Sequence, residues 1–245
     1  MCRHLAYLGP PVTLASLVLE PDHSLYEQSW APADMRGGGS VNADAYGLAW
    51  YVDGRVVRYR RDIPIWTDDN LPGLAGSIRS GAVVAAVRNG TDRMPHTEAA
   101  VAPFTHENWA FSHNGRITGW PDATVKLAER LPVADLLQLD APVDSALLFA
   151  LITARFATHS AQDAVSSVVR DVEAAAPGSR LNVLLTDGEQ LIATTWTHSL
   201  HVRRSDDSIT VASEPSGDGW TEVPDRSLLV ATATTLHITP MEGRE

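Results

Sequence analysis

The order of strand-like and helix-like segments constrains the fold of this 245-residue chain more than any other feature. Strand signals fill the first half, helical signals fill the middle and strand signals return near the C-terminus. Chains that group their elements in this way do not build alternating parallel βαβ units. We therefore expect an α+β fold, a four-layer αββα sandwich with two mostly antiparallel sheets. We expect residues 2–245 to form a single domain.

Turn residues place the expected strands. Asp53-Gly54 lies between strand-like residues 46–51 and 55–60, and Asp187-Gly188 lies between residues 181–186 and 190–196. Asp-Gly between two strand-like runs predicts a tight hairpin. Further strands are expected over residues 81–87, 109–113, 200–204, 209–212, 227–232 and 236–238. We expect the strand over residues 109–113 to break at Asn114-Gly115.

The middle of the chain predicts helices over residues 123–130, 144–152 and 161–176. Pro142 and Asp144 open the second of these, and Asp144 can serve as its N-cap. Pro177-Gly178 ends the third.

Composition excludes several functions. The formal net charge of -11 argues against a nucleic-acid partner, because phosphate binding needs clustered Lys and Arg. No apolar run reaches the roughly 18 residues of a membrane helix, so we expect no membrane partner and a cytoplasmic location. A single cysteine builds neither an internal disulfide nor a thiolate metal site. We expect no metal and no cofactor, and the sequence leaves the oligomeric state open.

Cys2 is the first residue with chemical potential. Methionine removal is favoured before a small residue, so we expect Met1 to be lost and the Cys2 amine to become free. An α-amine has a pKa of about 7.7–8.0, which suits a general base near neutral pH. One residue can then supply both nucleophile and base. The alternative is that a cysteine at position 2 has no function, and Cys2 taken alone favours this alternative.

Three further groups fit the same chemistry. The Asn114 side-chain amide and the Gly115 backbone N–H can stabilise an oxyanion, although Asn-Gly is also a common turn. Arg88, at the end of a buried strand, can grip a carboxylate, or it can be an ordinary surface arginine. Asp144 can bind an ammonium group or cap its helix. A γ-glutamyl substrate offers a carboxylate that matches Arg88, an ammonium that matches Asp144 and an amide carbonyl that matches Cys2 with Asn114 and Gly115.

The motifs around these residues resemble the class II glutamine amidotransferase family. The motifs are Met1-Cys2-Arg3, Arg88-Asn89-Gly90-Thr91, Ser112-His113-Asn114-Gly115-Arg116-Ile117 and Asp144-Ser145. The resemblance implies an N-terminal-nucleophile αββα fold over residues 2–245, with catalytic Cys2, Asn114 and Gly115. It implies that a small-molecule γ-glutamyl substrate is bound by Arg88, Thr91, His113 and Asp144.

Within that family, the chain resembles the amidohydrolases of ergothioneine biosynthesis in actinobacteria. The resemblance rests on residues 1–9, on residues 42–51 and on Ala212-Ser213-Glu214-Pro215. It implies hydrolysis of γ-glutamyl-hercynylcysteine S-oxide to glutamate and hercynylcysteine S-oxide. Two alternatives stay open: a glutaminase subunit that supplies ammonia to a partner synthase, and a catalytically inactive γ-glutamyl-binding module.

Overall fold

A computed structural model describes residues 2–35, 41–90 and 94–241. Its strands form two sheets in which every strand pair is antiparallel. The first sheet has the order β11-β9-β10-β1-β4-β2-β3. Its strands are β1 (Arg3–Thr13), β2 (Ala45–Val52), β3 (Arg55–Arg61), β4 (Arg79–Arg88), β9 (His201–Arg204), β10 (Ile209–Ala212) and β11 (Trp220–Glu222).

The second sheet has the order β13-β12-β8-β7-β6-β5. Its strands are β5 (Phe104–His106), β6 (Trp109–Arg116), β7 (Arg180–Thr186), β8 (Leu191–Thr195), β12 (Ser227–Ala231) and β13 (Leu236–Pro240). Both Asp-Gly hairpins are confirmed, as the pairs β2–β3 and β7–β8. At the first of them Asp53 and Gly54 both have positive φ, 50° and 73°, which matches the twist of a two-residue hairpin.

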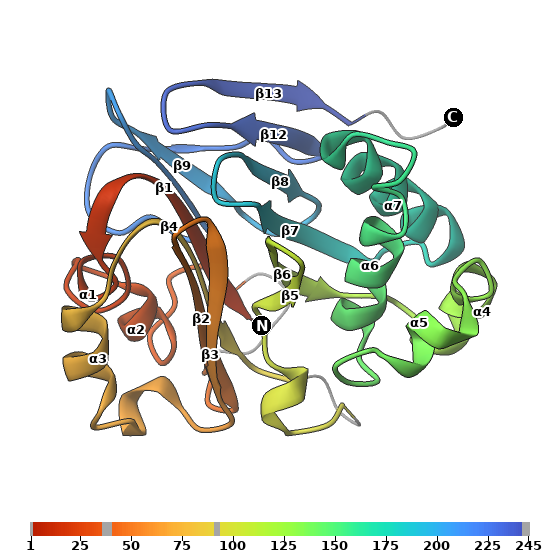
Figure 1. Ribbon diagram of the computed structural model, residues 1–245, viewed down its shortest axis with the longest axis horizontal. Helices are drawn as coiled ribbons and strands as arrows, with labels where there is room; N and C mark the ends of the chain where they lie inside the picture. Colours follow the sequence, from red (N-terminus) through yellow and green to blue (C-terminus); the bar gives the residue numbers. More distant parts are fainter. Residues whose placement is uncertain (1, 36–40, 91–93, 242–245) are drawn as a thin grey trace.

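Helices cover the outer face of each sheet (Figure 1). The helices on the first sheet are α1 (Ala15–Val18), α2 (Leu25–Gln28) and α3 (Leu71–Ser77). Those on the side of the second sheet are α4 (Val125–Ala128), α5 (Val133–Leu137), α6 (Asp144–Thr153) and α7 (Ala161–Ala175). Short 3-10 turns span Ile65–Thr67, Glu98–Ala100 and Asp122–Thr124. The predicted αββα sandwich is confirmed.

The alternation of side chains along the strands explains the layering. Successive residues of a strand point to opposite faces. In β1, Leu5 and Tyr7 pack against the helices of the first sheet, while Ala6 and Leu8 pack between the sheets. The layer between the sheets is rich in alanine, including Ala6, Ala49 and Ala193. Three hydrophobic layers therefore hold four layers of structure together.

The sequence predictions differ from the structure at several places, and the short elements α5, β5 and β11 are among those that were not predicted. The strand over residues 109–113 does not break: β6 continues through Asn114 and Gly115, which pair with Asn182 and Leu181 of β7. The first strand, β1, was not predicted. The helices α1 to α3 were also missed, because they are only four to seven residues long and α3 contains Pro72, Gly73 and Gly76.

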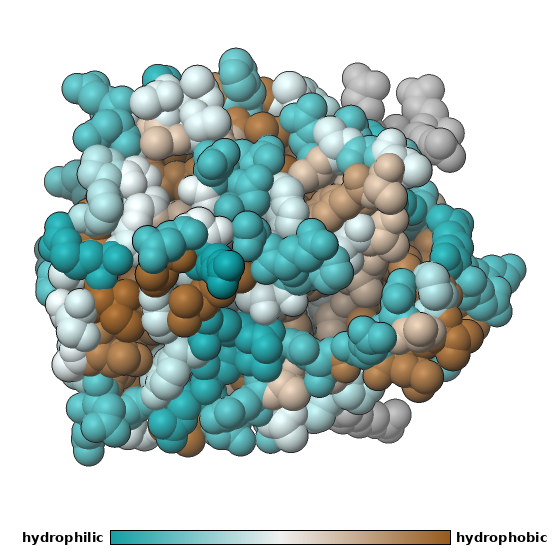
Figure 2. All heavy atoms as spheres, viewed as in Figure 1, coloured by the Kyte–Doolittle hydropathy of each residue, from teal (hydrophilic) through white to brown (hydrophobic). Residues whose placement is uncertain are grey.

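Two surface features complete the description. None of the described helices is long and apolar enough to cross a bilayer. Figure 2 shows a hydrophobic area at the lower right, over α4 and α5. In this region Val133 and Leu137 are 71% and 81% exposed.

Candidate active site

A pocket forms where the ends of β1 and β4 in the first sheet face β6 in the second. It brings together five of the residues predicted from the sequence: Cys2, Arg88, His113, Gly115 and Asp144. The other described residues that line it are Asn89, Gly90, Met94, Ala100, Val143 and Ser145. Residues far apart in the sequence thus share one cavity.

Cys2 lies directly before β1, which runs through the first sheet between β10 and β4. Its Sγ is 3.8 Å from the carbonyl oxygen of Asn89, the residue after Arg88. The thiol is partly exposed to the pocket. The predicted loss of Met1 concerns a residue outside the described part of the chain.

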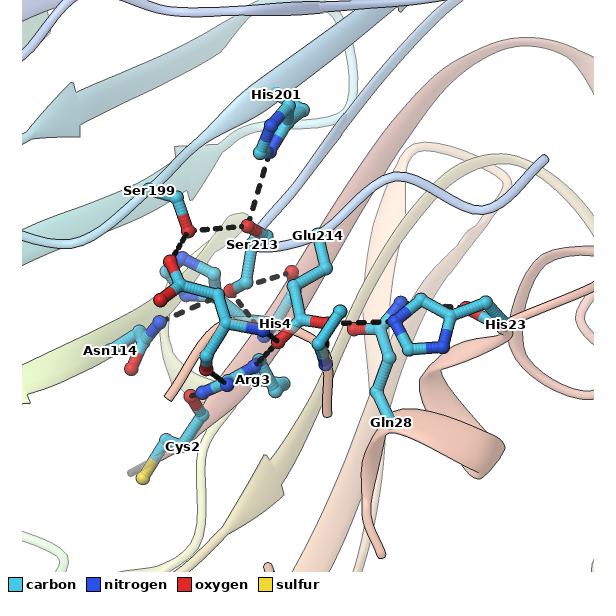
Figure 3. Close-up of polar contacts among 12 residues, drawn as sticks. Cys2, Arg3, His4, His23, Gln28, Asn114, Ser199, His201, Ser213 and Glu214 are labelled. Atoms are coloured by element: carbon cyan, nitrogen blue, oxygen red, sulfur yellow. Dashed lines mark hydrogen bonds and ion pairs between the residues drawn. The ribbon is translucent and has the colours of Figure 1, made fainter. Parts of the chain in front are cut away.

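A buried ion pair holds the residue after the nucleophile (Figure 3). Arg3 and Glu214 are each 1% exposed and are joined through Arg3 Nε and Glu214 Oε1. Arg3 Nη1 donates to the Cys2 carbonyl at 3.0 Å, and Arg3 Nη2 donates to the Asp34 carbonyl. Glu214 also accepts from the backbone N–H groups of Ala33 and Asp34 and contacts His23 Nε2 at 2.7 Å. These contacts fix the start of β1.

Burial alone would raise the pKa of Glu214. The charge of Arg3 and the hydrogen bonds from His23 and Ala33 outweigh burial and lower that pKa below its ordinary value. Glu214 therefore stays ionised and keeps Arg3 in place.

Arg88 ends β4 and reaches the same pocket. Its Nη1 is buried and makes no hydrogen bond to any residue that the structure describes. A Cβ at position 90 would lie 3.0 Å from Arg88 Nη2 and 3.1 Å from an Asp44 carboxylate oxygen. The absence of a side chain at Gly90 leaves room for the guanidinium, whose free donors suit a carboxylate.

Asp144 is the first residue of α6, and the position before the helix is Val143. The predicted N-cap is therefore wrong by one residue, because the Asp144 carboxylate is used elsewhere. Its Oδ2 accepts the Ile117 N–H at 2.9 Å, and its Oδ1 accepts the Ser145 N–H at 2.8 Å. The carboxylate is fixed at the pocket wall and, with four lone-pair positions, can still accept from an ammonium group.

His113 is held at both ring nitrogens. Nε2 lies 2.8 Å from the Arg180 carbonyl oxygen, and Nδ1 lies 3.0 Å from Ser145 Oγ. A carbonyl only accepts, so Nε2 carries a proton. In the neutral ring the Ser145 hydroxyl donates to Nδ1. His113 thus orients Ser145 next to Asp144.

Gly115 is required by the close approach of β7. A Cβ at this position would lie 1.8 Å from the Arg180 carbonyl oxygen. In addition, β5 pairs with β6 only as far as Phe111, so Ser112 to Arg116 pair with β7 alone among the described strands. This leaves one edge of β6 open at the pocket, where a backbone N–H can reach an oxyanion.

Asn114 faces the opposite side of β6 from His113 and Gly115, as alternation in a strand requires. It is 1% exposed and does not line the pocket itself. Its Nδ2 donates to Ser213 Oγ at 3.1 Å, while its Oδ1 has no partner among the described residues.

Two buried histidines, His4 and His198, have lowered pKa values. Burial, with smaller contributions from His113, His198 and Arg3, lowers the pKa of His4 well below its ordinary value. Burial, followed by the charges of Arg180 and Arg3, lowers the pKa of His198 to about 3. Both rings are neutral near pH 7. Burial and Arg116 also lower the pKa of Arg180, and Cys2 acts in the opposite direction, so Arg180 lies within electrostatic range of the thiol.

Thr91, which the family resemblance implies as a substrate-binding residue, lies outside the described residues. No tryptophan lines the pocket among the described residues; Trp30 instead packs edge to face against Tyr26 and Trp66. Residues 2–35, 41–90 and 94–241 contain no group of three or more His, Cys, Asp or Glu placed to hold a metal.

Sequence reasoning assigned no role to Arg3, Ser145, Ser213 or Glu214. The segment 212–215 was noted only as part of a resemblance. A signal existed in Ser213-Glu214-Pro215, which places a charged residue directly after a strand-like run, but the sequence does not show that Glu214 meets Arg3.

The comparisons place this geometry in a known family. A family model described as glutamine amidotransferases class-II matches residues 22–212, and the chain belongs to this family. The γ-glutamyl-hercynylcysteine sulfoxide hydrolase of Mycolicibacterium smegmatis is 38% identical over 98% of this chain and 100% of its own length. The hydrolase of the same name from Mycobacterium tuberculosis is 38% identical over 99% of this chain and 97% of its own length.

A solved structure shares the fold. The glutamine aminotransferase class-II domain protein from Silicibacter pomeroyi matches with a TM-score of 0.72 at 24% identity, covering 98% of this chain and 100% of that one. The family and the fold class predicted from the sequence are both confirmed.

Proposed function

We propose that this protein is a cysteine-dependent amidohydrolase that cleaves the γ-glutamyl amide bond of γ-glutamyl-hercynylcysteine S-oxide. The products are glutamate and hercynylcysteine S-oxide. The proposal is carried by the pocket shared by Cys2, Arg88 and Asp144. It is supported by the mycobacterial relatives of that name, which match over nearly their full length. We also propose that residues 2–245 act as one domain, since β1 is central to the first sheet while β12 and β13 complete the second.

The substrate binds by its two charged groups. The Arg88 guanidinium takes the α-carboxylate with the donors that no described residue uses. Asp144 takes the α-ammonium, and Ser145, oriented by His113, lies next to it. We propose that Thr91 supports Arg88. The γ-carbonyl then faces the thiol of Cys2.

The chemistry proceeds in two acyl-transfer steps. With Met1 removed, the α-amine of Cys2 accepts the thiol proton, and the sulfur attacks the γ-carbonyl carbon. Asn114 and the Gly115 N–H stabilise the oxyanion. The C–N bond breaks as the α-ammonium of Cys2 protonates the leaving amine. Water then attacks the thioester, giving glutamate and the free thiol.

The decisive experiment compares two substrates. Glutamate release is measured with γ-glutamyl-hercynylcysteine S-oxide and with glutamine, alongside an intact mass of the protein. We expect the S-oxide to be the better substrate, Met1 to be absent, and Cys2→Ala to release no glutamate while keeping its melting temperature. Better turnover of glutamine would instead favour a glutaminase that feeds a partner synthase. Retained Met1 with no release from either substrate would favour an inactive binding module.

A further inference from the structure

The Ser213 hydroxyl joins the start of β1 to Asn114 of the second sheet (Figure 3). Ser213 directly follows β10 and is 1% exposed. Its Oγ accepts the His4 N–H at 3.0 Å and Asn114 Nδ2 at 3.1 Å. Its own proton points to the His4 carbonyl oxygen at 3.3 Å. One hydroxyl thus links the strand that carries the nucleophile to the amide proposed for the oxyanion site.

The oxygen end of the Asn114 amide lacks a hydrogen-bond partner. Asn114 Oδ1 is buried and has no hydrogen-bond donor among the described residues. A buried acceptor without a partner has lost its hydrogen bonds to water and gained none in return, which destabilises this orientation. In Figure 3 the amide nitrogen is directed to Ser213, and the oxygen is directed to the side on which Cys2 lies. In this orientation the amide presents an acceptor, not a donor, to that side.

A half-turn of the amide removes this cost. A hydroxyl can both donate and accept, so Ser213 can bond either end of the amide. The His4 carbonyl already accepts the Ser213 backbone N–H at 2.9 Å, and therefore keeps a partner if the hydroxyl proton turns away. That proton can then be donated to Asn114 Oδ1, while Ser213 Oγ still accepts the His4 N–H. Both hydrogens on Nδ2 become free on the side of Cys2.

We propose that Ser213 is a positioning residue that selects which end of the Asn114 amide meets the reacting carbonyl. The inference rests on the proposed function, because it needs an oxyanion formed by attack of Cys2. With the Ser213 proton on Oδ1, Nδ2 donates to the developing negative charge. The charge in turn stabilises this orientation, so substrate and Ser213 act on the amide in the same direction. Without the hydroxyl, the developing charge alone must orient the amide, because no other described side chain bonds it.

A double-mutant cycle tests this role. Removing one oxyanion donor typically costs about 10²–10³ in kcat, so this loss is expected for Asn114→Ala. Ser213→Ala should lower kcat about 10- to 100-fold with KM nearly unchanged, because only the transition state is affected. In the Asn114→Ala background, Ser213→Ala should lower kcat by no more than about threefold further, since no amide remains to be oriented.

Ser112→Ala is the matched control. Ser112 is also 1% exposed, lies on β6 and bonds a β1 residue through its hydroxyl, at His4 Nδ1. Its hydroxyl bonds His4 and not the Asn114 amide, whose Nδ2 bonds Ser213, so this variant should keep kcat within a few-fold of the wild type. Ser213→Cys keeps a weak hydrogen-bond donor in a side chain of similar volume and should give an intermediate kcat. This variant replaces Ser213→Ala in the cycle if Ser213→Ala does not fold.

The cycle is run with whichever of the two γ-glutamyl substrates the wild type turns over faster. If the substrate assignment is wrong, the cycle is run with glutamine instead, and the expected coupling between Ser213 and Asn114 is the same. Independent losses from Asn114→Ala and Ser213→Ala, or a Ser112→Ala loss as large as that of Ser213→Ala, would overturn the positioning role. No glutamate release by the wild type from either substrate would overturn the proposed function together with this role.

Discussion

Two arginines on adjacent strands of the first sheet have opposite hydrogen-bonding states. Arg3 begins β1 and Arg88 ends β4, and Arg3 lies opposite Val87 in the strand pair. Every guanidinium nitrogen of Arg3 has a partner: Glu214, the Cys2 carbonyl and the Asp34 carbonyl. Arg88 has a buried Nη1 without any described partner, and it faces a pocket.

The difference separates a structural arginine from a binding one. A buried charge without a partner lowers stability, so a free buried donor is expected where a ligand completes its bonds. Arg3 uses its bonds to fix the start of β1, whereas the free Nη1 of Arg88 is available for the substrate carboxylate that we propose it binds. The comparison therefore predicts that changes near Arg3 reduce stability, while changes at Arg88 reduce substrate affinity.

The largest effect on stability is expected at Glu214. Glu214→Ala leaves the Arg3 guanidinium buried without its carboxylate, and breaking such a pair typically costs about 3–5 kcal/mol. Denaturant unfolding measures this loss. Glu189→Ala, at an exposed residue of the β7–β8 turn, is the control and should change stability by no more than about 0.5 kcal/mol. A loss at Glu214 as small as the control would show that Arg3 is not held by this pair.

Arg88→Ala should weaken substrate binding without lowering the stability of the fold. A hydrogen bond to a charged group contributes about 1.5–3 kcal/mol, so KM for the γ-glutamyl substrate should rise about 10- to 100-fold. The melting temperature should not fall, because Arg88 Nη1 bonds none of the residues that the structure describes. Arg79→Ala, at the exposed start of the same strand, is the control and should leave KM unchanged. An unchanged KM for Arg88→Ala would remove this residue from substrate binding.

Asp144 should behave between these extremes, because its carboxylate bonds the backbone and is also the group that we propose binds the substrate ammonium. Its carboxylate accepts two backbone N–H groups and also faces the pocket. Asp144→Asn keeps one acceptor and removes the charge, so KM should rise about tenfold and stability should fall by about 1 kcal/mol. Steady-state kinetics and thermal unfolding on one preparation measure both changes. A loss of stability with unchanged KM would assign Asp144 to the fold alone.

The sequence predicts features that have local signals but not contacts between distant positions. Asp-Gly hairpins and helical spacing are local signals, and they placed most strands and the helices α6 and α7 correctly. The family motifs identified Cys2, Arg88 and Asp144, which the fold then places in one pocket. The pairing of Arg3 with Glu214 spans 211 positions and leaves no local pattern. Asn114-Gly115 looked like a turn because its partner strand, β7, begins 64 residues after Arg116.

The smallest expected effect is on the pH dependence of the unfolding free energy in acid. The pKa of Glu214 is lowered from its ordinary value of 4.5, so the folded state gains stability from this carboxylate above pH 4.5 and loses it as pH falls through the lowered value. The pKa values of His4 and His198 are lowered from 6.5, so these rings also reduce the stability of the folded state in acid. Their contribution to the decline in stability begins as the pH falls below 6.5. Glu214→Gln should therefore flatten the decline in unfolding free energy below pH 4.5 and leave the decline between pH 6.5 and 4.5 intact. Denaturant unfolding at half-unit pH intervals separates the two regions. If both regions were equally steep in Glu214→Gln and in the wild type, the carboxylate that holds Arg3 would contribute nothing to the acid sensitivity.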